Sequence, residues 1–309
     1  MRTVLLAVTL PVVLSLMPAL TSQISSWAKP AGGVVLAPGP PAAASLGGLF
    51  SYPDGVAVGP RGTVYVVDTD NATVTKVSPT GAVSTLASGG FTYPTGIAVD
   101  SSGTVYVADA GTRSIKKISP RGELSTFVAS GFAYPTGVAV ATDGTVYVAD
   151  AGTSPMAGSV KKISPNGHVS TLASGFNKPN GVAVTAAGTV YVADTDNNSI
   201  KKIGADGVVT TVASASLNKP HGVAVDAAGI LYIADTYNNS IQKISLTGAI
   251  SSLARDLAYP AGIAVDAAGA VYVTDTGHAA LKKISLGGDV STLADNTPNT
   301  TASFSLGKG

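Results

Sequence analysis

Short apolar runs, separated by small and polar residues, follow one another along most of this chain. Between Pro179 and Ala213 the runs GVAV, TVYVA, SIKKI and VVTTVA alternate with segments that contain glycine, asparagine or aspartate. Valine and threonine dominate these runs, and their branched Cβ atoms favour extended backbone, whereas the frequent glycines would interrupt a helix. The pattern predicts four short strands that form an antiparallel meander.

The same pattern occurs six times. The motif P-x-G-(V/I)-A-V opens each copy, and the copies follow one another at intervals of 40 to 44 residues across residues 53 to 294. They begin at Pro53, Pro94, Pro135, Pro179, Pro220 and Pro260. One four-stranded sheet cannot bury both of its faces, and repeats of this length pack face to face around an axis. We therefore predict an all-β fold, a six-bladed β-propeller of four-stranded antiparallel blades.

The sequence motifs within each copy resemble those of a known family. The segments P-x-G-V-A-V, V-Y-V-A-D-T and N-N-S-I-K-K-I, with a glycine after them, resemble the NHL repeat. This resemblance covers residues 53 to 294 and implies a propeller that mostly presents binding surfaces. Similar propellers are sensor domains of bacterial receptor kinases, virginiamycin B lyases, gluconolactonase-like hydrolases and peptide-amidating lyases, so the resemblance leaves the activity open.

The two ends of the chain differ from the repeats. Residues 1–28 place one arginine before an apolar run and end in Ser26-Trp27-Ala28, a pattern typical of a secretory signal peptide. Residues 29–48 are rich in proline, glycine and alanine and are interpreted as a linker, followed by the propeller over residues 49–298 and a tail over residues 299–309. We expect a secreted, periplasmic or cell-surface protein. An uncleaved segment would instead tether it to the membrane as a sensor domain.

The amino-acid composition argues against some classes of binding partner and some kinds of chemistry. Charged residues make up 12% of the chain, the formal net charge is +1, and there is no cysteine. A broad basic face for nucleic acid is therefore not expected, and neither is a thiolate nucleophile or a disulfide. We expect a monomer that binds no nucleic acid. Closure of the ring could use an added strand from residues 33–36 or 302–306.

Residues that recur in every copy are interpreted as scaffold, because one active site does not need six of each. We expect the aspartate after the second strand to cap backbone N–H groups of the following turn. We expect the third-strand lysine to pack on a neighbouring blade with its ammonium near such an aspartate, and the second-strand tyrosine to pack between blades. The three sets are Asp68, Asp109, Asp150, Asp194, Asp235 and Asp275; Lys76, Lys117, Lys162, Lys202, Lys243 and Lys283; and Tyr65, Tyr106, Tyr147, Tyr191, Tyr232 and Tyr272.

Positions at which the copies differ are the candidates for binding. The variable residue of P-x-G should lie near the mouth of the central channel, and the residue before that proline should lie on the same face. In chain order these residues are Asp54, Thr95, Thr136, Asn180, His221 and Ala261, and Tyr52, Tyr93, Tyr134, Lys178, Lys219 and Tyr259. The third copy also has a longer loop after Asp150, AGTSPMAGS, with Met156 at its tip. Asp54, Asn180 and His221 could form a polar or metal site, or simply a hydrated channel mouth.

Candidate chemistry is sparse. Gluconolactonase-like propellers bind a divalent metal through acidic channel residues, and the channel-mouth positions here offer one carboxylate, Asp54. A virginiamycin-type lyase relies on a histidine and glutamate cluster with a metal, and no glutamate here matches it; His221 and His278 remain as candidate bases. We therefore favour a non-catalytic scaffold for a polypeptide, glycan or cell-wall ligand, without a cofactor. A metal-dependent lyase or hydrolase is the alternative.

Overall fold

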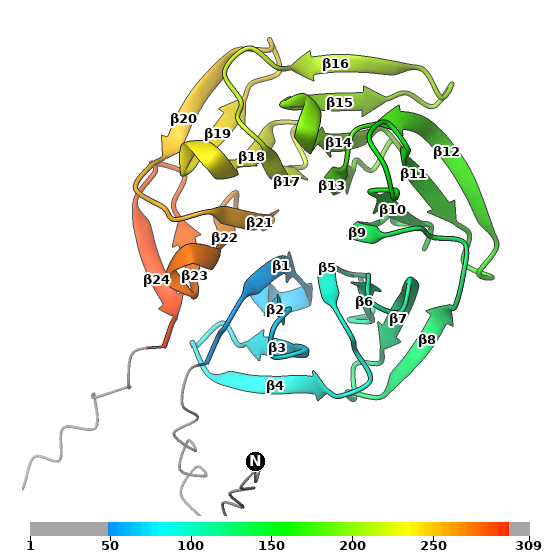
Figure 1. Cartoon of the computed structure of the whole chain (residues 1–309). Helices are drawn as coiled ribbons and strands as arrows, with labels where there is room; N and C mark the ends of the chain where they lie inside the picture. The colour runs from blue at the N-terminus through cyan, green and yellow to red at the C-terminus, as the bar shows by residue number, and fades with distance from the viewer. Residues whose placement is uncertain (1–48, 297–309) are drawn as a thin grey trace, which may run out of the picture. The chain divides into compact units, whose positions relative to one another are not determined.

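The computed structural model describes residues 49–296, and these residues form a ring of six four-stranded antiparallel sheets (Figure 1). Each sheet consists of four consecutive strands, so each copy of the repeat makes one blade. The predicted six-bladed propeller is confirmed. The predicted additional strands at residues 33–36 and 302–306 lie outside the described residues, as does the interpretation of residues 1–28 as a signal peptide.

The first three blades follow the chain from the N-terminal side. Blade 1 comprises β1 (Pro53–Val58), β2 (Val64–Asp68), β3 (Thr73–Val77) and β4 (Val83–Ser88), with the short helix η1 (Pro60–Gly62). Blade 2 comprises β5 (Pro94–Val99), β6 (Val105–Asp109), β7 (Ser114–Ile118) and β8 (Leu124–Val128). Blade 3 comprises β9 (Pro135–Val140), β10 (Val146–Asp150), β11 (Gly158–Ile163) and β12 (Val169–Phe176).

The last three blades each carry a helical turn after the second strand. Blade 4 comprises β13 (Pro179–Val184), β14 (Val190–Asp194), η2 (Thr195–Asn197), β15 (Ser199–Ile203) and β16 (Val209–Ala213). Blade 5 comprises β17 (Pro220–Val225), β18 (Leu231–Asp235), η3 (Thr236–Asn238), β19 (Ser240–Ile244) and β20 (Ile250–Ala254). Blade 6 comprises β21 (Pro260–Val265), β22 (Val271–Asp275), η4 (Thr276–His278), β23 (Ala280–Ile284) and β24 (Val290–Ala294).

The hydrophobic core lies between blades. Six clusters of buried side chains each join two neighbouring blades; the cluster between blades 1 and 2, for example, contains Tyr65 and Val67 together with Ile97 and Val107. Every recurrent second-strand tyrosine belongs to one of these clusters, so the predicted inter-blade role of the tyrosines is confirmed. Burial of apolar faces between like sheets is thus the main source of stability.

The recurrent lysine takes a different partner from the one expected. The Nζ atom of Lys117 lies 5.4 Å from the ring centroid of Tyr106, which pairs with it across neighbouring strands of the same blade. Lys283 and Tyr272 repeat this arrangement at 5.4 Å. The expectation of an aspartate near these ammonium groups is wrong in these blades, because the side chain lies along its own sheet and forms a cation–π contact.

The recurrent aspartates accept hydrogen bonds mainly from a segment other than the predicted one. Among the described residues, the predicted bond from a backbone N–H group of the following turn occurs at Asp68, from Asn71 N at 3.4 Å. Asp109 is fully buried and accepts hydrogen bonds from the backbone N–H groups of Thr92 and Tyr93, at 3.1 and 2.9 Å. These donors lie in the loop that leads into the first strand of the same blade. The following turn contributes a side chain instead, the Thr112 hydroxyl at 2.7 Å. Asp68, Asp194, Asp235 and Asp275 likewise bond to both loops of their blades, whereas Asp150 accepts its bonds from the loop before the first strand, at Ala133 N and Tyr134 N.

The ring closes by contacts between blades 6 and 1. Thr276 donates its hydroxyl hydrogen bond to the carbonyl oxygen of Pro53 at 2.7 Å, and Asn296 exchanges two hydrogen bonds with the backbone of Phe50. Phe50 is buried in the cluster that joins these two blades. None of the helical segments among the described residues has the length and apolar character needed to span a bilayer.

Candidate functional site

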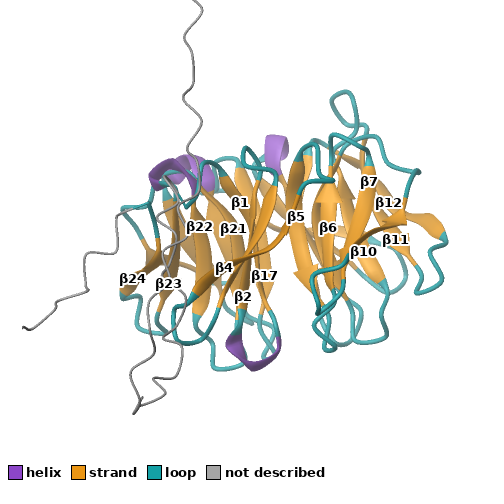
Figure 2. Cartoon of the chain, turned by 90° about the horizontal axis from the view of Figure 1, so that it is seen from below, coloured by secondary structure: helices purple, strands orange, loops and turns teal. Residues whose placement is uncertain are grey.

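The positions at which the copies differ lie at one end of the ring. The loops that lead into the first strands and the loops between second and third strands open at this end, which we call the top face. In the side view the helical turns η2, η3 and η4 belong to it, whereas η1 lies at the opposite end (Figure 2). The predicted placement of both sets of variable residues on one face agrees with this topology.

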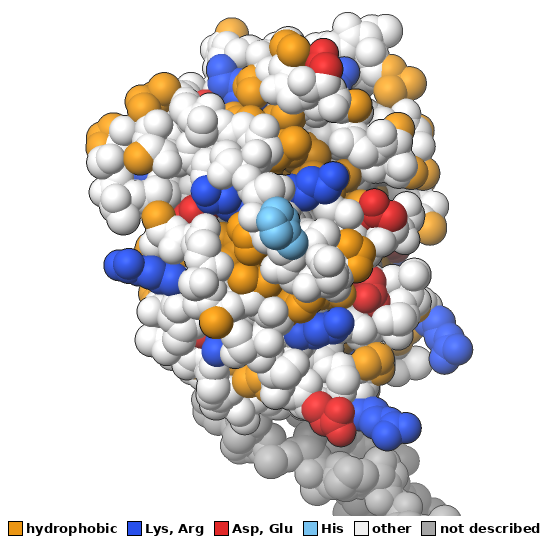
Figure 3. Space-filling model, turned by 90° about the vertical axis from the view of Figure 1, so that its right-hand side faces the viewer, with side chains coloured by type: hydrophobic (Ala, Val, Ile, Leu, Met, Phe, Trp, Pro, Cys, Tyr) orange, Lys and Arg blue, Asp and Glu red, His pale blue; other side chains and the backbone are white. Residues whose placement is uncertain are grey.

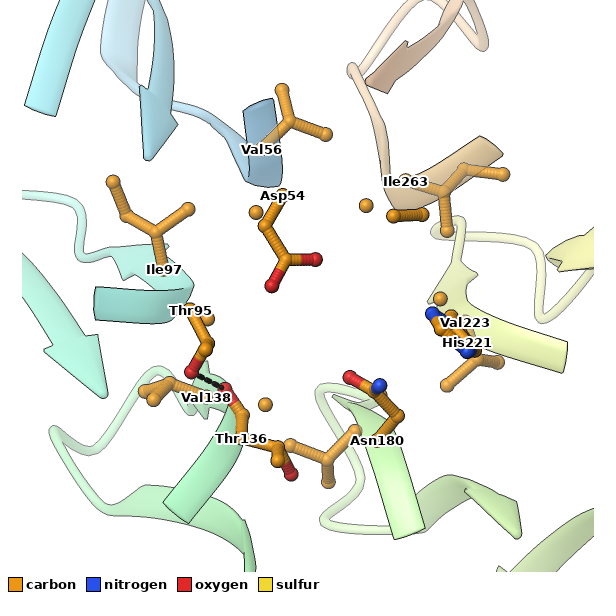
Figure 4. Close-up of a pocket in the computed structure, with 18 residues that line it drawn as sticks. Asp54, Val56, Thr95, Ile97, Thr136, Val138, Asn180, His221, Val223 and Ile263 are labelled. Atoms are coloured by element: carbon orange, nitrogen blue, oxygen red, sulfur yellow. Dashed lines mark hydrogen bonds between the residues drawn. The ribbon is translucent and has the colours of Figure 1, made fainter. Parts of the chain in front are cut away.

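A bulge directs the variable residue of P-x-G toward the axis. In every blade the pairing of the first two strands is irregular between the proline and the residue two positions after x, so x and the glycine have no partners in the ladder. Bulges turn side chains out of the plane of a sheet. As a result, all six x residues line a single axial pocket of about 420 Å³, including its open mouth (Figure 4).

Only half of these six residues offer free polar groups. The Thr95 hydroxyl donates to the carbonyl oxygen of Thr136 at 3.0 Å, and the Thr136 hydroxyl lies 2.9 Å from the carbonyl oxygen of Pro179. Both threonines are buried and tie neighbouring blades together, and Ala261 has no polar side chain. The hydroxyl groups of Thr95 and Thr136 thus already have backbone partners, which the sequence pattern does not show, and the role of these two residues in binding stays a prediction.

Asp54, Asn180 and His221 point into the axial pocket from blades 1, 4 and 5 (Figure 4). No hydrogen bond from another described residue satisfies these three side chains. Burial raises the pKa of Asp54 to about 7. Burial also lowers the pKa of His221 to about 4, with nearby Asp196 opposing the shift and Lys219 adding to it. Between about pH 4 and pH 7 the pocket is therefore lined by uncharged polar groups.

Replacing Asp54 by asparagine is expected to stabilise the protein more at pH 8 than at pH 4.5. The unfolded carboxyl group loses its proton near pH 4, whereas the folded one keeps it to about pH 7, so the folded state binds more protons in between. The parent protein therefore loses stability as the pH rises through this window, and the variant does not. We expect about 1–2 kcal/mol, because water at the pocket mouth reduces the penalty.

Thermal unfolding of the parent and the Asp54→Asn variant at both pH values measures this effect. Asp70→Asn is the matched control, since Asp70 is an exposed carboxylate on the top face of the same blade. An equal difference in Tm between parent and Asp54→Asn at pH 4.5 and pH 8 would contradict the assignment.

Five exposed tyrosines form an aromatic arc around the pocket, from blade 5 through blades 6, 1 and 2 to blade 3. Their exposed fractions lie between 39% and 54%. The rings of Tyr93 and Tyr134 are 6.5 Å apart, and those of Tyr237 and Tyr259 are 5.5 Å apart. The members are Tyr237, Tyr259, Tyr52, Tyr93 and Tyr134.

The remaining sector of the top face is charged. Lys178 and Lys219, which replace the tyrosine of the other blades, both form ion pairs with Asp196, at 3.3 and 2.7 Å. We call these three residues the lysine sector. The two lysines hold the pKa of Asp196 below its usual value against the effect of its burial, the largest single influence on this group. The sector carries one net positive charge beside His221 and Asn180.

Sequence analysis missed Asp196 and Tyr237. Both occupy the second position after the recurrent aspartate, and this column reads Asp70, Gly111, Gly152, Asp196, Tyr237 and Gly277 through the six copies. A comparison of the copies at this column would have shown the variation. The column lies on the top face, in the loop between the second and third strands.

Two further candidates lie among the same loops. Met156 is 54% exposed, and its sulfur accepts a long hydrogen bond of 3.8 Å from Asn197 of blade 4. The last two residues of its nine-residue loop, Gly158 and Ser159, belong to β11, which pairs with a lengthened β12. His278 replaces the asparagine of blades 4 and 5, and its Nδ1 lies 2.8 Å from the buried carboxylate of Asp275.

The side chains that could bind a metal here do not form the metal cluster that the family resemblance implies. Within residues 49–296, no three His, Asp or Glu side chains lie together as a possible metal site. Glu123, the one glutamate of the chain, lies in the turn before β8, at the end opposite the top face. Asp54 and His221 supply two ligand types in the axial pocket and lack a third.

Basic side chains do not gather into a broad patch where the surface is visible from the side. In that view, lysines and arginines are separated by uncharged atoms (Figure 3). The low charge of the whole chain agrees with this scattered arrangement.

The fold and the repeats define a six-bladed NHL-repeat propeller, and the NHL repeat itself matches residues 257–284. The sequence model of the virginiamycin B lyase family matches residues 39–240, about two thirds of the chain. The chain belongs to the virginiamycin B lyase family. No curated protein sequence matches it closely enough to add a named relative.

Solved structures share the fold at low sequence identity. A gluconolactonase from Xanthomonas campestris is 21% identical over 73% of this chain and 83% of its own, with a TM-score of 0.65. A catalytically inactive histidine-to-alanine variant of virginiamycin B lyase from Staphylococcus aureus, with quinupristin, is 15% identical over 78% and 83%, with a TM-score of 0.59. The nidogen/laminin complex contains a chain 19% identical over 74% and 92%, with a TM-score of 0.65.

Proposed function

We propose that this protein is a non-catalytic recognition propeller that binds a polypeptide, glycan or cell-wall ligand on its top face. The observation that carries the proposal is the concentration of departures from the repeat there: the aromatic arc, the lysine sector and the axial pocket all lie at one end of the ring. The residues that recur in every copy build the scaffold. Ligand specificity is therefore expected to depend on the residues that differ between the copies.

The chemistry of the top face supports binding. Half-exposed tyrosines give large contact area at low cost in conformational entropy. The free groups of Asp54, Asn180 and His221 add directional hydrogen bonds beside them. The absence of a three-ligand cluster within residues 49–296 gives catalysis less support than recognition.

We also propose that the protein acts outside the cytoplasm, on the basis of the signal-like residues 1–28. The mass of the protein purified from its native host tests this. Retention of Met1 together with fractionation to membranes would favour the tethered form.

Capture of partners from cell-wall and secreted fractions tests the recognition function. We expect a Tyr93→Ser/Tyr134→Ser variant to retain at least tenfold less of the captured ligand than the parent, because two adjacent rings of the arc are lost. Leu246→Ser/Leu286→Ser is the matched control, since both leucines are exposed in turns at the opposite end. Equal loss in both variants would contradict a top-face site.

A lyase is the second candidate, and the His278–Asp275 pair is the observation that favours it. A histidine oriented by a buried carboxylate is the arrangement of a general base. The family's name and the relative described with quinupristin suggest virginiamycin B or quinupristin as the substrate to test. Chromatographic conversion of quinupristin that is lost in His278→Ala or His221→Ala, with stoichiometric divalent metal in the protein, would establish this activity in place of recognition.

A further inference from the structure

We propose that the ligand of the top face is an acidic oligosaccharide, with its carboxylate at the lysine sector, its hydroxyl groups in the axial pocket and its sugar faces on the aromatic arc. This inference rests on the proposed recognition function and names its ligand class. Three independent features of the face, on different blades, support it.

The lysine sector supplies the charge. Lys178 and Lys219 come from neighbouring blades, and the carboxylate of Asp196 holds their ammonium groups close together. The single carboxylate neutralises one of the two ammonium charges, which leaves one positive charge unmatched. The side chain of Lys178 is 62% exposed and that of Lys219 is 39% exposed, so both ammonium groups can reach a second carboxylate.

The axial pocket supplies neutral hydrogen-bonding groups next to that charge. His221 lies within the electrostatic influence of Asp196 and Lys219, so the pocket and the lysine sector are adjoining parts of one site. Asp54 in its neutral form donates and accepts hydrogen bonds, as do the Asn180 amide and the neutral imidazole. Such a set suits hydroxyl groups, which also donate and accept.

The aromatic arc favours a sugar over an acidic peptide. Peptides bind by adding a strand to a sheet edge or by burying side chains as anchors in deep apolar pockets. Each sheet has two edge strands. The outer ones, β4, β8, β12, β16, β20 and β24, lie at the outer circumference of the ring, away from the pocket (Figure 1). The inner ones lie at the axis, where the backbones of neighbouring blades approach closely at the P-x-G glycines. The axial pocket mixes the polar side chains of Asp54, Asn180 and His221 with valine and isoleucine side chains, so it is not a purely apolar anchor pocket. Flat, half-exposed rings instead suit the apolar faces of pyranose rings.

Tyr52 is the middle member of the aromatic arc. Burial is the largest cause that raises the pKa of its hydroxyl, and the charges of Asp54, Tyr93, Asp70 and Tyr237 raise this pKa further. Tyr52 precedes β1 of blade 1, so in the order of the blades it lies between Tyr259 of blade 6 and Tyr93 of blade 2. An oligosaccharide whose first sugar lies at the axial pocket can therefore extend across the aromatic arc in either direction.

Calorimetric titration with short oligosaccharides of galacturonate, guluronate and hyaluronate tests the proposal. The methyl-esterified galacturonate oligomer is the neutral counterpart, and an oligoglutamate is the peptide counterpart. We expect at least one acidic oligosaccharide to bind, at least tenfold more tightly than its ester where one is available, with an affinity that falls as salt increases. Lys178→Gln/Lys219→Gln should lose at least tenfold toward the acid and little toward the ester.

Matched controls separate these effects from damage to the fold. Lys201→Gln/Lys282→Gln removes two lysines that bond to threonines of the outer strands, and it should bind like the parent. Tyr93→Ala/Tyr134→Ala should weaken acid and ester alike. Equal binding of acid and ester, or tighter binding of oligoglutamate, would overturn the inference and leave top-face recognition standing. Failure of all three acidic oligosaccharides would also overturn it, whereas conversion of quinupristin would refute the recognition function itself.

Discussion

Gly137→Ala is expected to destabilise the propeller by about 4 kcal/mol, above the roughly 1–3 kcal/mol that is typical of overpacking, because the clash is with backbone. Gly137 is the glycine of the P-x-G motif in blade 3, and a Cβ atom there would overlap the carbonyl oxygen of Asn180 in blade 4. Backbone conformation is not the obstacle, because Gly137 is not among the residues with positive φ. The overlap involves backbone on both sides, so no side-chain rotation relieves it.

Thermal unfolding should show a decrease in Tm of about 8–16 °C for this variant, given the size of the domain. Gly287→Ala is the control, because its added Cβ would meet neighbours no closer than 3.6 Å and its φ is also not positive. A Tm for Gly137→Ala within two degrees of that control would show that blades can move apart at the axis, contrary to the close packing described above.

The same close approach occurs at every blade junction. The Cβ positions of the six P-x-G glycines each collide with the x carbonyl of the next blade around the ring, and the last junction joins Gly262 to Asp54. Close packing at the axis therefore sets the width of the pocket. It also explains why x varies freely while the glycine recurs, since x projects into the pocket and the glycine faces backbone.

The fold could be predicted because the information is local and repeated. Each strand is a short run of valine-rich sequence between turn residues, and six copies at near-constant spacing define the blades without any knowledge of long-range contacts. The bounds of β13, β14, β15 and β16 follow the runs identified between Pro179 and Ala213. Burial of tyrosine between blades follows from the same geometry.

Side-chain partners were less predictable, because they depend on where two loops meet in space. The recurrent aspartates cap N–H groups 16 or 17 residues earlier in the chain, a separation that no turn pattern reveals. The same reason accounts for Thr95 and Thr136, whose hydroxyl groups bond to the backbone of other strands. Variation at a sequence position identifies where function can lie, and only geometry shows which atoms are free.

Asp109→Ala is expected to cost about 2–4 kcal/mol, the second large effect, because three donors lose a buried, charged acceptor. The Asp109 carboxylate is fully buried and binds Thr92 N, Tyr93 N and the Thr112 hydroxyl. The residues that carry these donors are exposed, so water replaces only part of the lost bonding. Asp109→Asn keeps one acceptor oxygen and loses the charge that strengthens the bonds, so we expect about 1–3 kcal/mol.

Urea unfolding of both variants measures the difference, with Asp289→Ala as the control, since Asp289 is exposed and bonds only within its own turn. Because the loop held by Asp109 also carries Tyr93, Asp109→Ala should in addition weaken ligand binding at the aromatic arc. Stability within 1 kcal/mol of the control would mean that water replaces the lost bonds in full. The six aspartates would then be better explained as part of a solvated ligand surface than as internal caps of the blades.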